Sequence, residues 1–186
     1  MACPITVTKF IGTISLGLLT GLSYSASTIT IPSLSILSTS TLASKSLKEA
    51  KRLNRRHGFR LANIGETCLI LAYSISPRHR KHPYLMWMVT MSLIGTYGVD
   101  YFFHRDMGFK AWLNTVIQDT RPLALFTGNE KKKEDDIVVV EAEEGINGEV
   151  VRREMERERR MQGVRAIFSG IALSMGIVGL WGDRRS

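Results

Sequence analysis

The sequence predicts an all-α membrane protein with about four transmembrane helices and one long charged loop between the third and the fourth. The first observation is segregation. Although 44% of the 186 residues are hydrophobic and 23% are charged, the charges lie in blocks between apolar runs. A soluble helical protein would distribute charge along every helix with a 3.6-residue period. The second observation is that residues 10–31 contain no charged residue and no histidine. At ~1.5 Å per residue, about 20 such residues cross the hydrocarbon core of a bilayer.

The first span is expected to end at Pro32, because a helix interior tolerates proline poorly. The uncharged Ser/Thr-rich residues 33–44 either extend the helix beyond Pro32 or form an interfacial loop. Three later apolar runs predict the second span at residues 61–76, the third at 84–103 and the fourth at 164–181. The second run is the shortest and contains Glu66, so a surface or re-entrant helix is the alternative there. Aromatic side chains gather towards both ends of the third run, which is typical of membrane interfaces.

These spans divide the chain into three regions. Residues 1–103 form a membrane region with three spans, residues 104–163 form a polar, partly disordered loop, and residues 164–186 hold the fourth span and a short tail. We expect the loop to end in a charged helix of alternating sign that continues into the fourth span. The basic block at residues 45–60 is either a short helix on the lipid head groups or a solvated loop.

The net charge of +8 indicates a lipid surface rather than nucleic acid as the charged partner, because the basic blocks flank apolar runs. Counting Lys and Arg near the span ends places loops 45–60 and 104–163 in the cytosol and both termini across the membrane. The basic cluster of Arg78, Arg80 and Lys81, between the second and third spans, favours the opposite orientation.

Small residues predict where the helices pack. Gly17 and Gly21 form a G-x-x-x-G pattern in the first span. In lipid, small residues let helix backbones approach closely and so mark a packing face. We expect this face to meet the small residues of the fourth span, with a homo-oligomer through the same face as the rival. Those residues of the fourth span include Gly170, Ser174 and Gly176.

Two acidic residues inside the spans need an explanation, because ionisable groups in a membrane are costly. Glu66 is expected to form an intramembrane ion pair with Arg165, or with Arg60, and so to hold helices together. Asp100 lies about one turn from the end of the third span, and we expect it to extend to the lipid head groups. The alternative for Glu66 is that it too extends to the head groups, and the alternative for Asp100 is a carboxylate–arginine cluster that ties the helices together.

No catalytic or metal-binding pattern stands out, so the sequence predicts a protein that is not an enzyme and has no cofactor. It contains no P-loop, no G-x-G-x-x-G and no Ser-His-Asp elbow. The histidines lack the i,i+4 spacing of a metal site on a helix; they are His57, His79, His82 and His104. The runner-up function is a small four-helix membrane oxidoreductase or transport subunit that uses Glu66.

One short apolar island interrupts the polar loop, with acidic residues on both sides. Such β-branched runs can add as an edge strand to a partner sheet, and the acids can then face basic residues of that partner. The island resembles a SUMO-interacting motif, and the alternative is a disordered linker with a chance apolar patch. Its residues are Ile137, Val138, Val139 and Val140.

Several short segments resemble a known fungal family. They are ITVTK at residues 5–9, GLSYSAS at 21–27, SPRHRKHPYL at 76–85 and VGLWG at 178–182. Together they are similar to the autophagy-related protein 33 family of the mitochondrial outer membrane. The resemblance implies a small multi-span protein needed for selective autophagy of mitochondria (mitophagy), acting with autophagy machinery or other outer-membrane proteins. It implies no catalytic residue. A scaffold in another organelle, such as the peroxisome or the endoplasmic reticulum, is a further alternative.

Overall fold

The computed structural model describes residues 4–37, 39–76, 82–120 and 148–183, and every regular element in them is helical, which confirms the all-α class. In chain order these elements are α1 (Pro4–Ser25), the π-helix η1 (Ala26–Thr30), α2 (Ile31–Leu34), α3 (Ser40–Ile75), α4 (Tyr84–Leu93), the π-helix η3 (Ile94–Gly98), α5 (Val99–Phe103), the 3-10 helix η4 (Arg105–Met107), α6 (Phe109–Thr120) and α7 (Gly148–Asp183).

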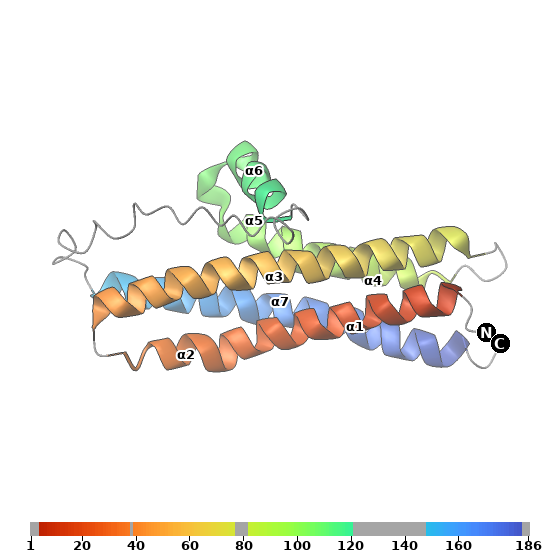
Figure 1. The fold of residues 1–186 in the computed structure, drawn as a ribbon, viewed down its shortest axis with the longest axis horizontal. Coiled ribbons are helices and arrows are strands. Elements are labelled where there is room, and N and C mark those ends of the chain that lie inside the picture. The colour runs from red at the N-terminus through yellow and green to blue at the C-terminus, as the bar shows by residue number, and fades with distance from the viewer. Residues whose placement is uncertain (1–3, 38, 77–81, 121–147, 184–186) are drawn as a thin grey trace, which may run out of the picture.

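Four long helical runs form an elongated bundle (Figure 1). The first run is α1 with η1 and α2, the second is α3, the third is α4 with η3 and α5, and the fourth is α7. Each run packs most extensively on its two neighbours in a ring, with α1 on α3 and α7, and α4 on α3 and α7. Consecutive runs point in opposite directions, so both termini lie at the same end of the bundle (Figure 1).

The first run continues past Pro32, so the expected end of the helix at this residue is wrong. The π-helix η1 precedes the proline, and the main-chain N–H of Ile31 bonds to the Ala26 carbonyl. Pro32 occupies the first turn of α2, where its missing N–H is tolerated. The wider π turn absorbs the change in hydrogen-bonding pattern, and the helix ends at Leu34.

The second run also differs from the expected division. The basic block at residues 45–60 and the apolar segment at 61–76 are not separate elements, because α3 is one helix of 36 residues. Buried side chains run along its whole inner face, from Leu47 through Phe59 to Leu69. This continuous packing face keeps the basic block helical. By contrast, the charged segment and the fourth apolar run share one helix as expected, because α7 is continuous over 36 residues.

Two helical segments of the described chain are long and apolar enough to cross a membrane, Ile5–Leu34 and Gly148–Gly182. The expected number was four. The apolar part of α3 follows directly on the basic block, and the run at 84–103 contains Asp100 and several hydroxyl side chains, which lower their mean hydropathy.

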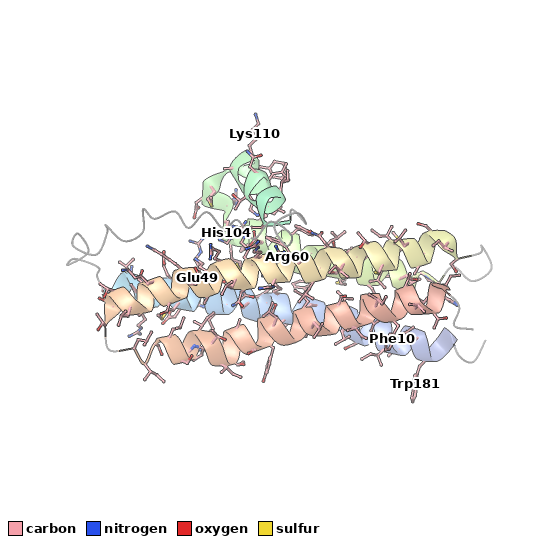
Figure 2. All side chains as sticks on the ribbon, viewed as in Figure 1. Phe10, Glu49, Arg60, His104, Lys110 and Trp181 are labelled. Atoms are coloured by element: carbon pink, nitrogen blue, oxygen red, sulfur yellow. The ribbon has the colours of Figure 1, made fainter. Side chains whose placement is uncertain are left out.

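The bundle has two chemically different halves. In the half that holds the termini, Leu16, Leu69 and Met88 belong to an apolar core. A smaller core at the other end includes Leu47 and Met155. Figure 2 places the exposed Phe10 and Trp181 in the terminal half and the charged Glu49 in the other half. We refer to these as the apolar half and the charged half.

Helix α6 stands on the side of the bundle near its middle, next to α5 and α3 (Figure 1). The chain turns into α6 at Gly108, whose φ of 77° is accessible mainly to glycine. Trp112 and Val116 of α6 are buried with Phe59 of α3. This contact brings α6 over the boundary between the apolar half and the charged half.

Candidate functional site

Asp100 is the centre of a buried ionic cluster at that boundary. Its carboxylate has no solvent exposure and contacts side chains from three other helices. Its Oδ2 atom accepts hydrogen bonds from Arg55 Nη2 of α3, at 3.1 Å, and from Trp112 Nε1 of α6, at 2.7 Å. Its Oδ1 atom lies 3.6 Å from Arg165 Nη2 of α7. One carboxylate therefore joins all the helices that meet here except α1.

The two arginines share an aromatic neighbour. The guanidinium groups of Arg55 and Arg165 lie over the Phe59 ring, 5.5 Å and 5.8 Å from its centroid. Arg165 is only 1% exposed, so its charge depends on Asp100 and on this ring rather than on water. Asp100 and Phe59 together make the burial of these two cations tolerable.

Further ion pairs extend the cluster into the charged half. Arg55 Nε lies 3.5 Å from Asp119 Oδ2, and Lys51 Nζ lies 3.7 Å from Glu158 Oε2. Glu158 is buried and accepts a hydrogen bond from Gln162. Partial burial raises the pKa of the Asp119 carboxyl above its usual value, and the nearby Arg55 opposes that rise. These pairs connect α3, α6 and α7.

A cavity of about 340 Å³ adjoins the cluster. The Nδ1 atom of His104, which lines it, is 2.9 Å from the main-chain carbonyl oxygen of Asp100. In the described parts of the chain, no three His, Cys, Asp or Glu side chains gather as metal ligands would. The other residues that line the cavity are Lys51, Arg52, Arg55, Met107, Thr115, Asp119, Glu158 and Met161.

The expected ion pair between Glu66 and Arg165 is not formed. Arg165 lies at the level of Gly58 and Phe59 on α3, two turns from Glu66, and it pairs with Asp100. Glu66 is buried and accepts a hydrogen bond of 3.0 Å from Ser92 of α4. Arg60 makes no ion pair with Glu66 either. The expectation that Asp100 extends to the head groups is also wrong, because Trp112 and the two arginines enclose it.

Comparison with known sequences places the chain in a family. A sequence model described as autophagy-related protein 33 matches residues 1–136. The chain belongs to the autophagy-related protein 33 family. Autophagy-related protein 33 of Gibberella zeae is 26% identical to this family member over 196 residues of alignment, which cover 96% of the chain and 91% of the relative. No solved structure matches the chain.

The family match includes only part of the cluster. Arg55, Asp100 and Trp112 lie within residues 1–136, whereas Arg165 lies beyond them. The apolar island at residues 137–140 is also beyond the match, and it falls outside the residues that the structure describes. In this family member, the cluster thus combines three residues of the matched region with one residue of α7.

The structure places some of the expected small residues between α1 and α7. A Cβ atom added to Gly17 would lie 3.7 Å from Leu173 of α7, and one added to Gly170 would lie 3.6 Å from Thr20 of α1. Gly176 packs against Met88 and Thr13. By contrast, Gly21 has nothing within 4 Å of such a Cβ, and Ser174 is exposed.

The backbones of α1 and α3 approach each other at two further glycines, one on each helix. A Cβ on Gly12 would lie 3.3 Å from the Gly65 carbonyl oxygen, and one on Gly65 would lie 3.5 Å from the Gly12 carbonyl oxygen. These two residues mark the crossing of α1 and α3. Gly12 lies a little over one turn before Gly17 in the same apolar run. Gly65 is a single glycine beside Glu66, and it carries no pattern of its own.

The Glu66–Ser92 hydrogen bond gives a test of packing in the apolar half. We expect Ser92→Ala to lower the free energy of unfolding by about 1–2 kcal/mol, because the buried carboxylate loses its donor. Glu66→Gln keeps an acceptor for Ser92 and is expected to stay within about 1 kcal/mol of wild type. The measurement is the thermal unfolding midpoint in detergent.

Thr90→Ala is the matched control, because the exposed Thr90 hydroxyl bonds only to the Met86 carbonyl of its own helix. Equal midpoints for Ser92→Ala and Thr90→Ala would contradict a structural role for this bond.

Proposed function

We propose that this protein is a multi-span protein of the mitochondrial outer membrane that acts in mitophagy without catalysing a reaction. The observation that carries the proposal is membership of the autophagy-related protein 33 family. The division of the bundle into an apolar half and a charged half adds physical support. In this view, the apolar half lies in the membrane and the charged half extends into the cytosol.

The exposure of the apolar helices supports the membrane placement. Only 28% of the most apolar window of Ile5–Leu34 and 22% of that of Gly148–Gly182 are buried within the chain. The core helix of a soluble protein would bury most of such a window. Large side chains exposed here, such as Phe10, Ile177 and Trp181, would otherwise face water.

The same reasoning extends the proposal to four spans. In the apolar half, Ile70 and Leu71 of α3, Trp87 of α4 and Ile94 of η3 are also exposed. Because α3 packs on α1 and α4 packs on α7 within the same ring, a bilayer that covers α1 and α7 also covers α3 and α4. The ionisable Glu66 of α3 and the Ser92 hydroxyl of α4 are buried in the bundle interior, where a membrane protein places such groups.

The charged half is the part that we propose meets the autophagy machinery. It contains the first halves of α3 and α7, and it exposes charges such as Arg52 and Glu156. The segment at 121–147 links α6 to α7 and carries the apolar island at 137–140 with its acidic neighbours. We propose that this island docks as a strand on a SUMO-like partner.

Localisation and topology test the membrane part of the proposal. A fluorescent fusion is expected to coincide with mitochondrial markers, and protease added to intact mitochondria is expected to cut between residues 121 and 147. Peroxisomal or endoplasmic reticulum fluorescence would point to a scaffold in that organelle instead. A fully protected segment would reverse the proposed orientation.

The docking part has its own prediction. In a deletion strain under starvation, wild-type protein is expected to restore mitochondrial turnover, and Val139→Ala/Val140→Ala is expected to reduce both turnover and capture of the partner. Leu123→Ala/Leu125→Ala removes similar apolar side chains from the same segment and serves as the control. Normal turnover in the deletion strain would remove the mitophagy role, whereas equal capture by both variants would remove only the docking island.

A further inference from the structure

Arg60 of α3 differs from the other basic residues at the boundary between the two halves. Its Nε and Nη2 atoms are buried, and they have no hydrogen-bond partner among the described residues. Arg55, Arg165 and Lys51 each face a carboxylate within 4 Å, whereas no described carboxylate makes an ion pair with Arg60. A buried guanidinium without a counter-charge is unfavourable, so an anion is the missing partner that its chemistry indicates.

The neighbourhood of Arg60 carries a surplus of positive charge. Arg56, one turn before it, also makes no ion pair with a described carboxylate, and both arginines lie close enough to Asp119 to affect that carboxylate electrostatically. Asp119 already lies 3.5 Å from Arg55 Nε, and Asp100 lies between Arg55 and Arg165. Asp119 and Asp100 are therefore already paired with other cations.

The third nitrogen of the Arg60 guanidinium, Nη1, gives the site access to the surface. Unlike Nε and Nη2, this atom is accessible at the surface. Arg60 makes no hydrogen bond within the described residues. The side chain as a whole is partly exposed. Because no ion pair holds the guanidinium in place, it is free to turn towards an anion at the surface. Figure 2 shows Arg60 at mid-length of α3, on the side where α6 stands.

The surface beyond Arg60 is apolar rather than aqueous in character. Ile64 follows one turn later on α3 and is 48% exposed, and Leu71 follows two turns after that and is 51% exposed. Thr67 lies between them, and its hydroxyl bonds to main-chain carbonyls of α3. The same face of α3 therefore changes from Arg56 and Arg60 to uncharged, mainly apolar side chains within one helical turn. A free phosphate needs only the two arginines, whereas a phospholipid needs the arginines for its head group and the apolar stripe for its acyl chains.

We propose that Arg60 and Arg56 bind the phosphate of an anionic phospholipid in the cytosolic leaflet, with its acyl chains along the Ile64–Leu71 face of α3. Arginine suits this role because its planar guanidinium donates two parallel hydrogen bonds to phosphate oxygens. The site rests on the membrane placement of the proposed function. It lies where the charged half of the bundle meets the apolar half. In the proposed membrane placement, this boundary is at the depth of the lipid phosphates.

Native mass spectrometry of the full chain tests the site. The protein is purified in detergent and mixed with phosphatidic acid, phosphatidylcholine or inorganic phosphate. We expect wild type to retain one phosphatidic acid more strongly than phosphatidylcholine, and Arg56→Gln/Arg60→Gln to weaken that retention about tenfold or more, since hydrogen bonds to charged groups are lost. Arg56→Lys/Arg60→Lys keeps the charge without the planar fork and is expected to fall between the two.

Arg152→Gln/Arg153→Gln on α7 is the control, because it removes the same charge at two exposed residues in the charged half. Equal loss in this control and in Arg56→Gln/Arg60→Gln would overturn the site in favour of general surface charge. Inorganic phosphate that displaces the lipid at similar concentration would overturn the lipid assignment in favour of a free phosphate site. Circular dichroism of each variant confirms that it is folded.

Failure of this site is distinguishable from failure of the proposed function. If a carbonate wash releases the protein from mitochondria, the proposed membrane placement is wrong, and the lipid site fails with it. Resistance to carbonate combined with undiminished phosphatidic acid retention by Arg56→Gln/Arg60→Gln would remove only the lipid site.

Discussion

Replacing Asp100 with asparagine is expected to lower the free energy of unfolding by about 3–5 kcal/mol, the cost of removing one partner from a buried ionic cluster. The variant keeps an acceptor for Trp112 Nε1 but no longer neutralises Arg55 and Arg165. Arg165 is 1% exposed and cannot recover hydration. For a chain of this length, the unfolding midpoint in detergent should fall by roughly 10 °C.

Asp119→Asn is the matched control for Asp100→Asn. Asp119 is partly exposed, and its raised pKa means that the folded state favours the neutral carboxyl more than the unfolded chain does. Ionised Asp119 therefore adds little stability near neutral pH, and the asparagine variant should unfold within about 1 kcal/mol of wild type. Similar midpoints for the two variants would contradict a central role for Asp100.

A compensating substitution separates charge from packing. Arg165→Met in the Asp100→Asn background removes the uncompensated cation while keeping an unbranched side chain over Phe59. Buried ion pairs replaced by apolar side chains are often as stable as the originals. The double variant should therefore recover part of the lost midpoint. If it is less stable than Asp100→Asn alone, the arginine contributes chiefly through packing or cation–π contact.

The second large effect is expected at the contact between η3 and α7. A Cβ on Gly95 would lie 2.7 Å from the Phe168 Cβ, which is closer than real Cβ atoms approach. The Phe168 Cβ cannot move without its helix. Gly95→Leu should therefore lower the free energy of unfolding by about 3 kcal/mol, at the upper end of the usual cost of overpacking. The measurement is again the unfolding midpoint in detergent.

Gly98 lies in the same π-helix and provides the matched control. A Cβ there meets only Ile94 of its own helix, at 3.8 Å, and the residue is exposed. Gly98→Leu should be neutral or slightly stabilising, because leucine favours helix more than glycine does by roughly 0.5–1 kcal/mol. If Gly95→Leu and Gly98→Leu have the same midpoint, η3 and α7 are not packed as the structure has them.

Only one of the two glycines in the G-x-x-x-G pattern packs against another helix of the same chain. Gly17 meets Leu173 of α7, but Gly21 meets nothing, and it lines an apolar groove with Thr20, Ala166 and Ile167. The G-x-x-x-G pattern is therefore only half used within one chain. The pattern could not reveal this, because a face in the sequence does not say how far a helix crossing extends.

Charge patterning revealed the buried acids but not their partners. Glu66 and Asp100 stand out in apolar runs, and Arg165 stands out at the start of another. Which acid meets which arginine depends on the relative heights of α3, α5 and α7, and the sequence does not contain these heights. Trp112 is one residue in the sequence that indicates a partner for a buried acid, since a buried indole N–H needs an acceptor. Its partner, Asp100, lies only 12 residues earlier.

The sequence by itself determined the helical class, the apolar runs and the charge blocks, because local hydropathy and helix periodicity depend on neighbouring residues alone. The tertiary structure decided three things. It showed that the basic block of α3 is helical, that Asp100 rather than Glu66 binds Arg165, and that Gly65 and Gly95 lie at close contacts between helices. Each depends on which faces meet in a four-helix ring, and that is set by packing among residues far apart in the chain.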